Sequence, residues 1–292
     1  MKDTAPIFRE LEKEDFRVLT AIETGMRHYE WVPVEEIYRF SGLDEAEVEY
    51  RLARLARRSL IQRKTAAVIG YQLLFKGYDQ LALRALVQRE TIEALGSKIA
   101  VGKESEIYDA LGAGDRILII KFHREGRSSF KQVKRTRAHL AGKTHFSWMY
   151  ASRLAAEREF RALEMLYPRV DVPQPVDQNR NAIVMGVLPG VELYSVKIKA
   201  GDRRLVLNLI LEQVKKAYQI GIIHGDLSEF NVMISPEGVS IIDWPQYVTA
   251  KHSHADEFLR RDIANILKYF KKKYGIKRSE EKAIKWVKEA GD

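Results

Sequence analysis

Two short polar segments, each bordered by apolar residues, carry the residue types that phosphoryl transfer needs. The first reads IHGDLSEFN and contains Asp226 and Asn231, and the second reads SIIDWP and contains Asp243. One carboxylate can orient or deprotonate an acceptor, while an asparagine and a second aspartate hold Mg²⁺ against phosphate groups. The spacing matches the catalytic and metal-binding loops of kinases, and the apolar borders predict buried strands that hold these loops rigid.

A nucleotide site of this kind also needs a buried lysine, a glutamate on a helix and a turn that presents backbone amides. Lys121 ends the apolar run ILIIK and is the candidate lysine, although a lysine in this position more often reaches the surface. Glu159 is the candidate glutamate, and spacing alone does not exclude Glu157 or Glu164. The segment Gly102-Lys103-Glu104-Ser105 precedes the lysine strand but fits neither a Walker A motif nor a G-x-G-x-x-G loop.

Length and composition bound the class of protein. The 292 residues suffice for about two domains, and a hydrophobic content of 46% excludes wholesale disorder. The chain has no cysteine, which excludes disulfides, thiolate metal sites and a cysteine nucleophile. We see neither a signal peptide nor an apolar run of about 18–20 residues, and therefore expect a cytoplasmic protein that has no membrane association.

The N-terminal residues predict three helices followed by a hairpin, the order of a winged helix-turn-helix. The helices are expected over residues 8–28, after Pro33 and after Asp44, which is placed to cap the third. Strands are expected over 60–64 and 68–75.

The rest of the chain predicts an α+β unit. An amphipathic helix over 78–95, ending near Gly96, would connect it to the winged helix. The basic stretch at about 124–150 is expected to be a long flexible loop. Strands are predicted at 116–122, 181–188, 232–235 and 239–243, and helices at about 151–167, 204–220 and 254–274.

Positive charge is concentrated in three segments. The net charge is +9, and basic residues cluster in 51–64, 121–143 and 268–288. Such clusters favour RNA or a phosphate-rich ligand as a partner. The alternative is a solvated face whose acidic partners lie elsewhere in the sequence.

Taken together, the motifs closely resemble those of the RIO atypical protein kinases, and the winged-helix-like segment resembles their second branch, archaeal in character. The motifs that carry the resemblance are GKES at 102–105, KFH at 121–123, SFK at 129–131, HGDLSEFN at 224–231 and IDWPQ at 242–246.

The resemblance implies an α+β fold with a winged helix over 1–77, a connector over 78–96, a kinase N-lobe over 97–188 and a C-lobe over 189–292. This kinase fold is trimmed, because no Ala-Pro-Glu motif, activation segment or peptide-binding subdomain follows Asp243. Gly225 follows His224 where conventional kinases have arginine, and Ser228 replaces their lysine. These departures fit the RIO pattern.

The resemblance also implies a set of roles. ATP with Mg²⁺, or Mn²⁺ in its place, would be the cofactors. Asp226 and Asp243 would be the catalytic carboxylates, and Asn231 and Asp243 the metal ligands. The expected nucleotide-binding residues are Gly102, Lys103, Glu104 and Ser105 around the triphosphate, Lys121 with Glu159, Met185 and Val187 at the adenine, and Ser228 and Asn231 near the phosphates. Asp262 would brace the catalytic loop, and His224 would be structural.

RIO proteins are associated with late maturation of the small ribosomal subunit. The resemblance therefore implies an atypical serine/threonine protein kinase or ATPase whose partners are pre-ribosomal RNA and protein, with RNA contacts through 51–64 and 121–143. Two other functions stay open: a small-molecule kinase like the aminoglycoside phosphotransferases, and a non-catalytic RNA-binding scaffold. The winged-helix segment argues against the first, and a competent residue at every catalytic position argues against the second.

Overall fold

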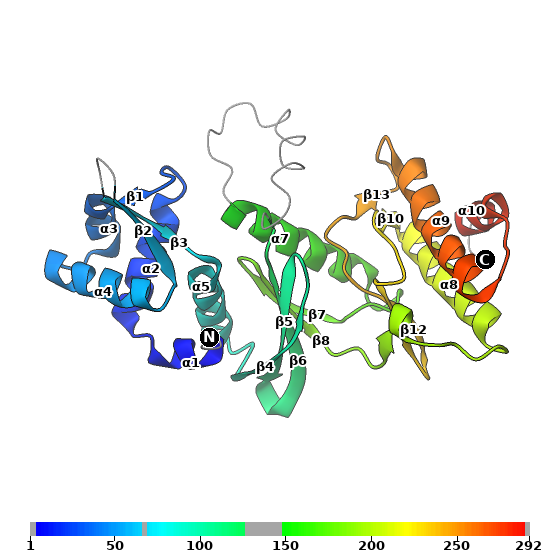
Figure 1. The fold of residues 1–292 in the computed structure, drawn as a ribbon, viewed down its shortest axis with the longest axis horizontal. Coiled ribbons are helices and arrows are strands. Elements are labelled where there is room, and N and C mark those ends of the chain that lie inside the picture. Colours follow the sequence, from blue (N-terminus) through cyan, green and yellow to red (C-terminus); the bar gives the residue numbers. More distant parts are fainter. Residues whose placement is uncertain (1–3, 66–68, 126–147, 290–292) are drawn as a thin grey trace. The chain divides into compact units, whose positions relative to one another are not determined.

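The computed structural model describes residues 4–65, 69–125 and 148–289 (Figure 1). The chain forms two compact units, one of residues 1–157 and 177–184 and the other of residues 158–176 and 185–292. The division falls inside a long helix, α7 (Trp148–Leu166). None of the helices in the described part of the chain is both long and apolar enough to cross a membrane.

The first unit begins with the predicted winged helix. Three strands pair in the antiparallel order β1-β3-β2 beside the helices. The elements are α1 (Thr4–Glu10), α2 (Lys13–Gly25), β1 (Val32–Pro33), α3 (Val34–Ser41), α4 (Glu45–Arg57), β2 (Ile61–Thr65) and β3 (Ile69–Leu73).

The single helix predicted over 8–28 is wrong, because two helices, α1 and α2, occupy this stretch. A capping box starts α2: the Asp15 carboxylate accepts a hydrogen bond of 2.9 Å from the Glu12 amide. The predicted cap of the third helix is confirmed, because Asp44 accepts from the Glu47 amide at 2.9 Å. Each such cap contributes about 1 kcal/mol to helix stability.

One stripe of α2 forms the centre of the winged-helix core. Val18, Leu19 and Ile22 are fully buried and recur at helical spacing, and they pack with Ile37 and Leu55 in one apolar cluster. Each of these side chains stabilises the fold by about 1.5–3 kcal/mol relative to leaving it exposed.

Acidic side chains neutralise half of the basic segment 51–64. Arg51 and Arg54 of α4 both contact Glu12 and the fully buried Asp15, and Arg58 pairs with Glu10 at 3.0 Å. The remaining basic residues of the segment are exposed: Arg57, Arg63 and Lys64. Arg51, Arg54 and Arg58 therefore follow the alternative prediction, in which acidic residues elsewhere in the sequence pair with the basic cluster.

The connector helix α5 (Phe75–Gln88) starts and ends earlier than predicted. Gly96 does not end a helix, because it lies in the first strand of a five-stranded sheet. This sheet has the order β4-β5-β6-β8-β7. Its strands are β4 (Ala94–Val101), β5 (Ser105–Gly112), β6 (Arg116–His123), β7 (Pro175–Asn179) and β8 (Ala182–Gly186), with a short 3-10 helix, η1 (Ala113–Asp115), before β6.

A buried ion pair ties α5 to the sheet. The Arg124 guanidinium donates to both oxygens of Asp79, at 2.6 and 2.5 Å, and Asn181 donates to Asp79 at 2.9 Å. Arg124 and Lys121 are both buried. They are the fourth and first residues of the segment 121–143, which was predicted to contact RNA. Residues 126–147, which hold the rest of that segment and most of the predicted loop 124–150, lie outside the described residues.

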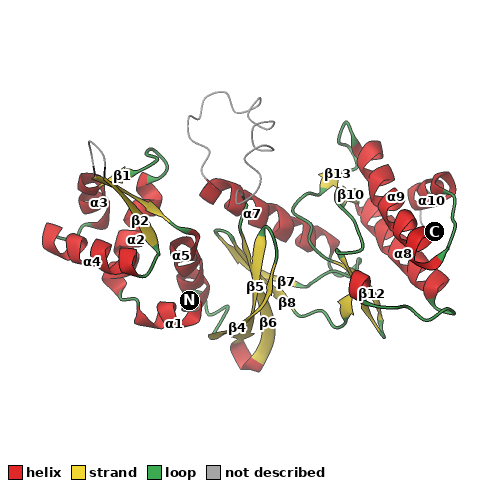
Figure 2. Ribbon diagram, viewed as in Figure 1, coloured by secondary structure: helices red, strands yellow, loops and turns green. Residues whose placement is uncertain are grey.

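The second unit contains two small sheets, the C-terminal part of α7 and the helices α8, α9 and α10; helices are drawn red in Figure 2. The sheets have the orders β12-β11-β9 and β10-β13, and α8 packs against α9 and α10. The elements are β9 (Val191–Glu192), η3 (Leu193–Ser195), α8 (Arg203–Ile220), β10 (Ile222–Ile223), β11 (Val232–Ser235), β12 (Gly238–Ile241), β13 (Val248–Thr249), α9 (Ala255–Tyr274) and α10 (Glu280–Lys288). We did not predict α10.

The Arg51 ion pairs predict a stability effect. Arg51→Ala would leave the buried Asp15 with one arginine fewer, and should lower the free energy of unfolding by about 3 kcal/mol in chemical denaturation. Arg57→Ala removes the same charge from the exposed side of the same helix and should stay within about 0.5 kcal/mol of wild type. Equal losses in both variants would contradict the structural role of these pairs.

Candidate functional site

The catalytic-loop candidate, residues 224–231, connects β10 to β11 in the second unit. The strands bury Ile222, Ile223 and Val232 on either side of it. Gly225 has a φ of +82°, and a Cβ atom there would lie 2.6 Å from the Gln246 carbonyl oxygen. The turn therefore needs glycine for both its conformation and its space.

Helix α9 holds this loop through one carboxylate. Asp262 is 1% exposed, and its two oxygens accept hydrogen bonds from the Gly225 amide at 2.8 Å and the Leu227 amide at 2.9 Å. The predicted bracing role of Asp262 agrees with these contacts. Burial raises the pKa of this carboxyl, while both backbone donors and the neighbouring His224 oppose the shift.

The same helix also binds the carbonyl groups of the loop. Arg261 donates to the Gly225 carbonyl, and Asn265 donates to the Leu227 carbonyl at 3.1 Å. Three residues of one helix thus satisfy four backbone groups on either side of Asp226. The Asp226 side chain itself is exposed, as an acceptor-binding carboxylate must be.

His224 is fixed in one tautomer by its surroundings. Its Nδ1 accepts a hydrogen bond from the Asp226 amide at 3.3 Å, so the proton lies on Nε2, which donates to the Ile242 carbonyl at 3.0 Å. The ring also packs 4.5 Å from the buried ring of Trp244. These contacts join the catalytic loop to the Asp243 loop, and they fit the structural role predicted for His224.

The two predicted metal ligands lie together. Asn231 Nδ2 donates to an Asp243 oxygen at 3.4 Å, and the Ser228 hydroxyl donates to Asn231 Oδ1 at 2.7 Å. Asp243 has a φ of +69°, a conformation that costs a non-glycine residue roughly 1–3 kcal/mol and that clusters at functional sites. Ser228, predicted to lie near the phosphates, orients the Asn231 amide through this hydrogen bond.

This pair fits a magnesium ion bound together with nucleotide phosphates. Mg²⁺ is commonly held by one or two carboxylates plus phosphate oxygens and water. An amide oxygen and a carboxylate oxygen are what Asn231 and Asp243 offer. In the described part of the chain no three His, Cys, Asp or Glu side chains gather to form a self-sufficient metal site.

Burial distinguishes the three glutamates of α7 that the sequence left open. Glu159 is 2% exposed, whereas Glu164 is exposed and Glu157 is half-buried in a pair with Arg153 at 2.7 Å. Glu159 is therefore the one member of this set with the burial of a functional glutamate.

The predicted phosphate-binding segment is a tight hairpin in the first unit. Residues 102–104 connect β4 to β5, and the Gly102 amide donates to the Ser105 carbonyl at 2.9 Å. The Arg124 amide donates to the Glu104 carbonyl at 2.7 Å, which ties the hairpin to the end of β6. Lys103 is exposed.

Lys121 lies in β6 opposite Ile107 and is 5% exposed. The alternative of a lysine that reaches the surface is therefore wrong. At the predicted adenine-binding segment, Met185 is buried and Val187 is half exposed, and the Gly186 amide between them donates to the Gln174 carbonyl at 2.8 Å.

Comparisons with known proteins show the family to which the chain belongs. A family model described as the RIO domain matches residues 106–283, and a second, described as the Rio2 N-terminal domain, matches residues 8–89. The chain belongs to the RIO kinase family. It is a Rio2-type serine/threonine protein kinase, with the winged helix and trimmed kinase fold predicted from its sequence.

The relatives are similar over most of this chain. A RIO-type serine/threonine-protein kinase Rio2 from Methanocaldococcus jannaschii is 46% identical over 262 residues, which are 88% of this chain and 96% of that protein. A serine/threonine-protein kinase rio2 from Dictyostelium discoideum is 36% identical over 94% of this chain but only 53% of its own length. The chain thus spans about half of this longer relative.

The solved structures of relatives include a crystal structure of the Rio2 kinase–ADP/Mg²⁺–phosphoaspartate complex from Chaetomium thermophilum. It matches with a TM-score of 0.82 and 34% identity, covering 100% of this chain and 91% of that chain. That homologue binds ADP and Mg²⁺, the cofactor class predicted here.

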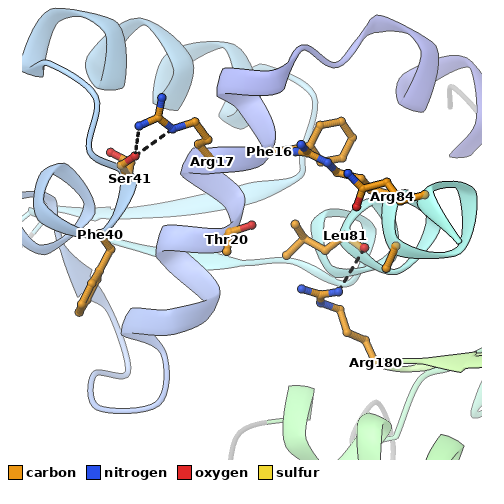
Figure 3. A pocket seen from close by; sticks show the side chains of 10 residues that line it. Phe16, Arg17, Thr20, Phe40, Ser41, Leu81, Arg84 and Arg180 are labelled. Atoms are coloured by element: carbon orange, nitrogen blue, oxygen red, sulfur yellow. Dashed lines mark hydrogen bonds between the residues drawn. The ribbon is translucent and has the colours of Figure 1, made fainter.

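This Rio2-type chain also has a hollow of about 380 Å³ in its first unit, away from the motif residues (Figure 3). Three arginines line it, and two are already engaged: Arg17 donates to the Ser41 and Gly42 carbonyls, and Arg180 forms a two-bond pair with Glu23. The third, Arg84, lies 4.4 Å from the ring centre of Phe16. Two of the three guanidinium groups therefore hold the fold together.

Sequence reasoning missed three residues that position the site. Arg261 and Asn265 bind the loop carbonyls, and Arg158 donates to the Pro245 and Tyr247 carbonyls at 2.9 and 2.6 Å, beyond Asp243. The signal for Arg261 and Asn265 was their spacing from Asp262, which places all three within about one turn of one helix. No local pattern marks Arg158.

Asp262 generates a testable prediction. Asp262→Asn keeps the shape but turns one acceptor oxygen into an NH₂ donor, which opposes an amide N–H of the loop. We expect faster hydrogen exchange at Gly225 and Leu227, and a fall in kcat on the order of tenfold to a hundredfold from the displaced Asp226.

Glu257→Gln, on an exposed position of the same helix, is the matched control and should change neither quantity. Wild-type exchange rates in Asp262→Asn would show that the carboxylate does not hold the loop.

Proposed function

We propose that this Rio2-type kinase transfers phosphate from Mg-ATP through Asp226, Asn231 and Asp243, and that it acts in late maturation of the small ribosomal subunit. The observation that supports this most strongly is the Asn231–Asp243 pair beside a loop whose backbone groups are bound by α9. Phosphoryl transfer depends chiefly on positioning and charge, and a rigid loop supplies the positioning.

In this proposal each side chain has a defined task. The exposed Asp226 carboxylate accepts the proton of the acceptor hydroxyl. The oxygens of Asn231 and Asp243 would hold Mg²⁺, which supplies charge neutralisation at the phosphates when bound. The Ser228 hydroxyl donates a 2.7 Å hydrogen bond to the Asn231 amide oxygen and so fixes its orientation.

Residues outside these two loops would supply nucleotide contacts. Lys121 is buried on β6, where a lysine is held rigidly, and we assign it to the phosphates. The hairpin of residues 102–105 offers backbone amides and the Ser105 hydroxyl to the same groups. Met185 and Val187 are assigned to adenine.

The ribosomal role rests on the family and on charge. Pre-ribosomal RNA and protein are the proposed partners, in the cytoplasm, and the net charge of +9 favours association with a polyanion. The exposed basic residues of the winged helix, Arg57, Arg63 and Lys64, are the candidates for RNA contact there, because their neighbours pair with acids.

Single-turnover hydrolysis of γ-labelled ATP tests the catalytic assignment. Asp226→Ala and Asp243→Ala should each lose at least about a hundredfold in rate, and purified small subunits should stimulate only the wild type. Glu237→Gln, in an exposed turn, is the control and should match wild type. If ATP binds but neither aspartate variant changes turnover, the scaffold function replaces this proposal.

A second prediction concerns the chemistry of Asp243. The homologue structure contains a phosphoaspartate, and we propose that Asp243 receives the γ-phosphoryl group as ADP leaves. Protein label from γ-labelled ATP should then be released by hydroxylamine, which attacks acyl phosphates, and should be missing in Asp243→Ala. Label that resists hydroxylamine would instead indicate a phosphorylated serine or threonine.

A further inference from the structure

A groove of about 580 Å³ adjoins the catalytic loop in the second unit. Ser228 and Glu229 of the catalytic loop line one side. Helix α9 lines the other with Asn265, Lys268, Tyr269, Lys272 and Lys273. We call this the α9 groove. Whatever occupies it lies against the loop that presents Asp226.

Two lysines of the α9 groove can pair with negative charges of a ligand. Lys268 and Lys272 are exposed, lie one turn apart, and pair with no carboxylate within the described part of the chain. Like charges at this spacing destabilise a helix slightly. Lys273, in contrast, donates to the Tyr194 and Val196 carbonyls at 3.0 and 2.9 Å and serves the fold.

An exposed aromatic pair lies next to residues that line the α9 groove. The Phe230 and Tyr194 rings lie 4.9 Å apart and are 58% and 47% exposed. Phe230 follows Glu229 in the catalytic loop, and the Tyr194 carbonyl accepts from Lys273. The groove thus combines positive charge with an apolar edge, which suits a polypeptide that carries both acidic and apolar side chains.

We propose that the α9 groove docks the acceptor polypeptide of the kinase reaction and selects acceptors with acidic residues next to the phosphorylated serine or threonine. This rests on the proposed function of Asp226. Glu229 repels acids at the loop side of the groove, so the acidic residues lie toward Lys268 and Lys272. A large apolar side chain of the acceptor lies against Phe230 and Tyr194.

The trimmed fold makes such a surface necessary. Residues 244–254, which connect the Asp243 loop to α9, are too few for the activation segment and peptide-binding subdomain with which conventional kinases orient their substrates. An RNA strand would also find the lysines favourable, but the enzyme class requires a protein hydroxyl beside Asp226, and this favours a peptide.

Fluorescence anisotropy measures docking without catalysis. The probes are a short labelled peptide in which one serine is followed by glutamates and a leucine, its counterpart with glutamines, and labelled oligouridine. We expect the glutamate peptide to bind the full-length protein about tenfold more tightly than the glutamine peptide, with a preference that weakens as salt rises. The double variant Lys268→Glu/Lys272→Glu should abolish this preference.

Further variants distinguish an effect of the α9 groove from an effect of overall charge or of misfolding. Lys271→Glu reverses one charge at an exposed neighbour that does not line the groove, half of the change in the double variant, and should bind like wild type. Lys268→Gln/Lys272→Gln should lose part of the preference without reversing the charge. In kinase assays the loss should appear as a higher KM for the glutamate peptide.

Three results would overturn the proposal: equal affinity of wild type for the two peptides, an equal loss in Lys271→Glu, or tight oligouridine binding that depends on Lys268 and Lys272 while neither peptide binds. Asp226→Ala distinguishes this proposal from the proposed function. If it binds the glutamate peptide normally but still phosphorylates it, the catalytic assignment fails and the α9 groove stands.

Discussion

The two hydrogen bonds that the Asp262 carboxylate accepts from amides of the catalytic loop are the constraint on which the site depends. Burying a carboxylate is unfavourable, and the cost is offset here because both oxygens accept backbone N–H groups that would otherwise be unsatisfied. The loop cannot move without exposing these groups. Asp226, between the two bound amides, therefore projects from a backbone that is fixed on both sides.

Contacts that radiate from this point order the second loop as well. The His224 ring accepts a hydrogen bond from the Asp226 amide, donates one to the Ile242 carbonyl and packs against Trp244. Asp243 follows directly in its left-handed conformation, where the Asn231 amide reaches it. The unfavourable backbone at Asp243 is thus held by neighbours that are themselves held by α9.

How much the sequence predicts differs between local and distant features. The candidate residues of the catalytic and metal loops could be proposed from the sequence because their types and spacing are local. The α4 cap and most helices were predicted for the same reason. The break between α1 and α2 was missed because Glu12 is an uncommon cap whose partner, Asp15, lies inside the expected helix. Contacts between distant segments, such as Arg158 with Pro245, leave no local pattern.

The basic clusters show most clearly that contacts between distant segments cannot be predicted from the sequence. A run of arginines in α4 and directly after it predicts a basic surface. Glu10, Glu12 and Asp15, far earlier in the sequence, nevertheless neutralise three of them. The sequence shows where basic residues cluster, whereas only the fold shows which of them are exposed and which pair with acidic residues. In the second unit the reverse holds, because Lys268 and Lys272 stay available beside the catalytic loop.

The central claim is that Asn231 and Asp243 hold the catalytic metal next to a loop braced by Asp262. A crystal structure with Mn²⁺ and a non-hydrolysable ATP analogue tests it most directly, because anomalous scattering locates the ion without ambiguity. The account predicts an ion coordinated by Asn231 Oδ1 and an Asp243 carboxylate oxygen, with both Asp262 hydrogen bonds retained. An ion bound elsewhere, or a loop released from Asp262 in that complex, would contradict it.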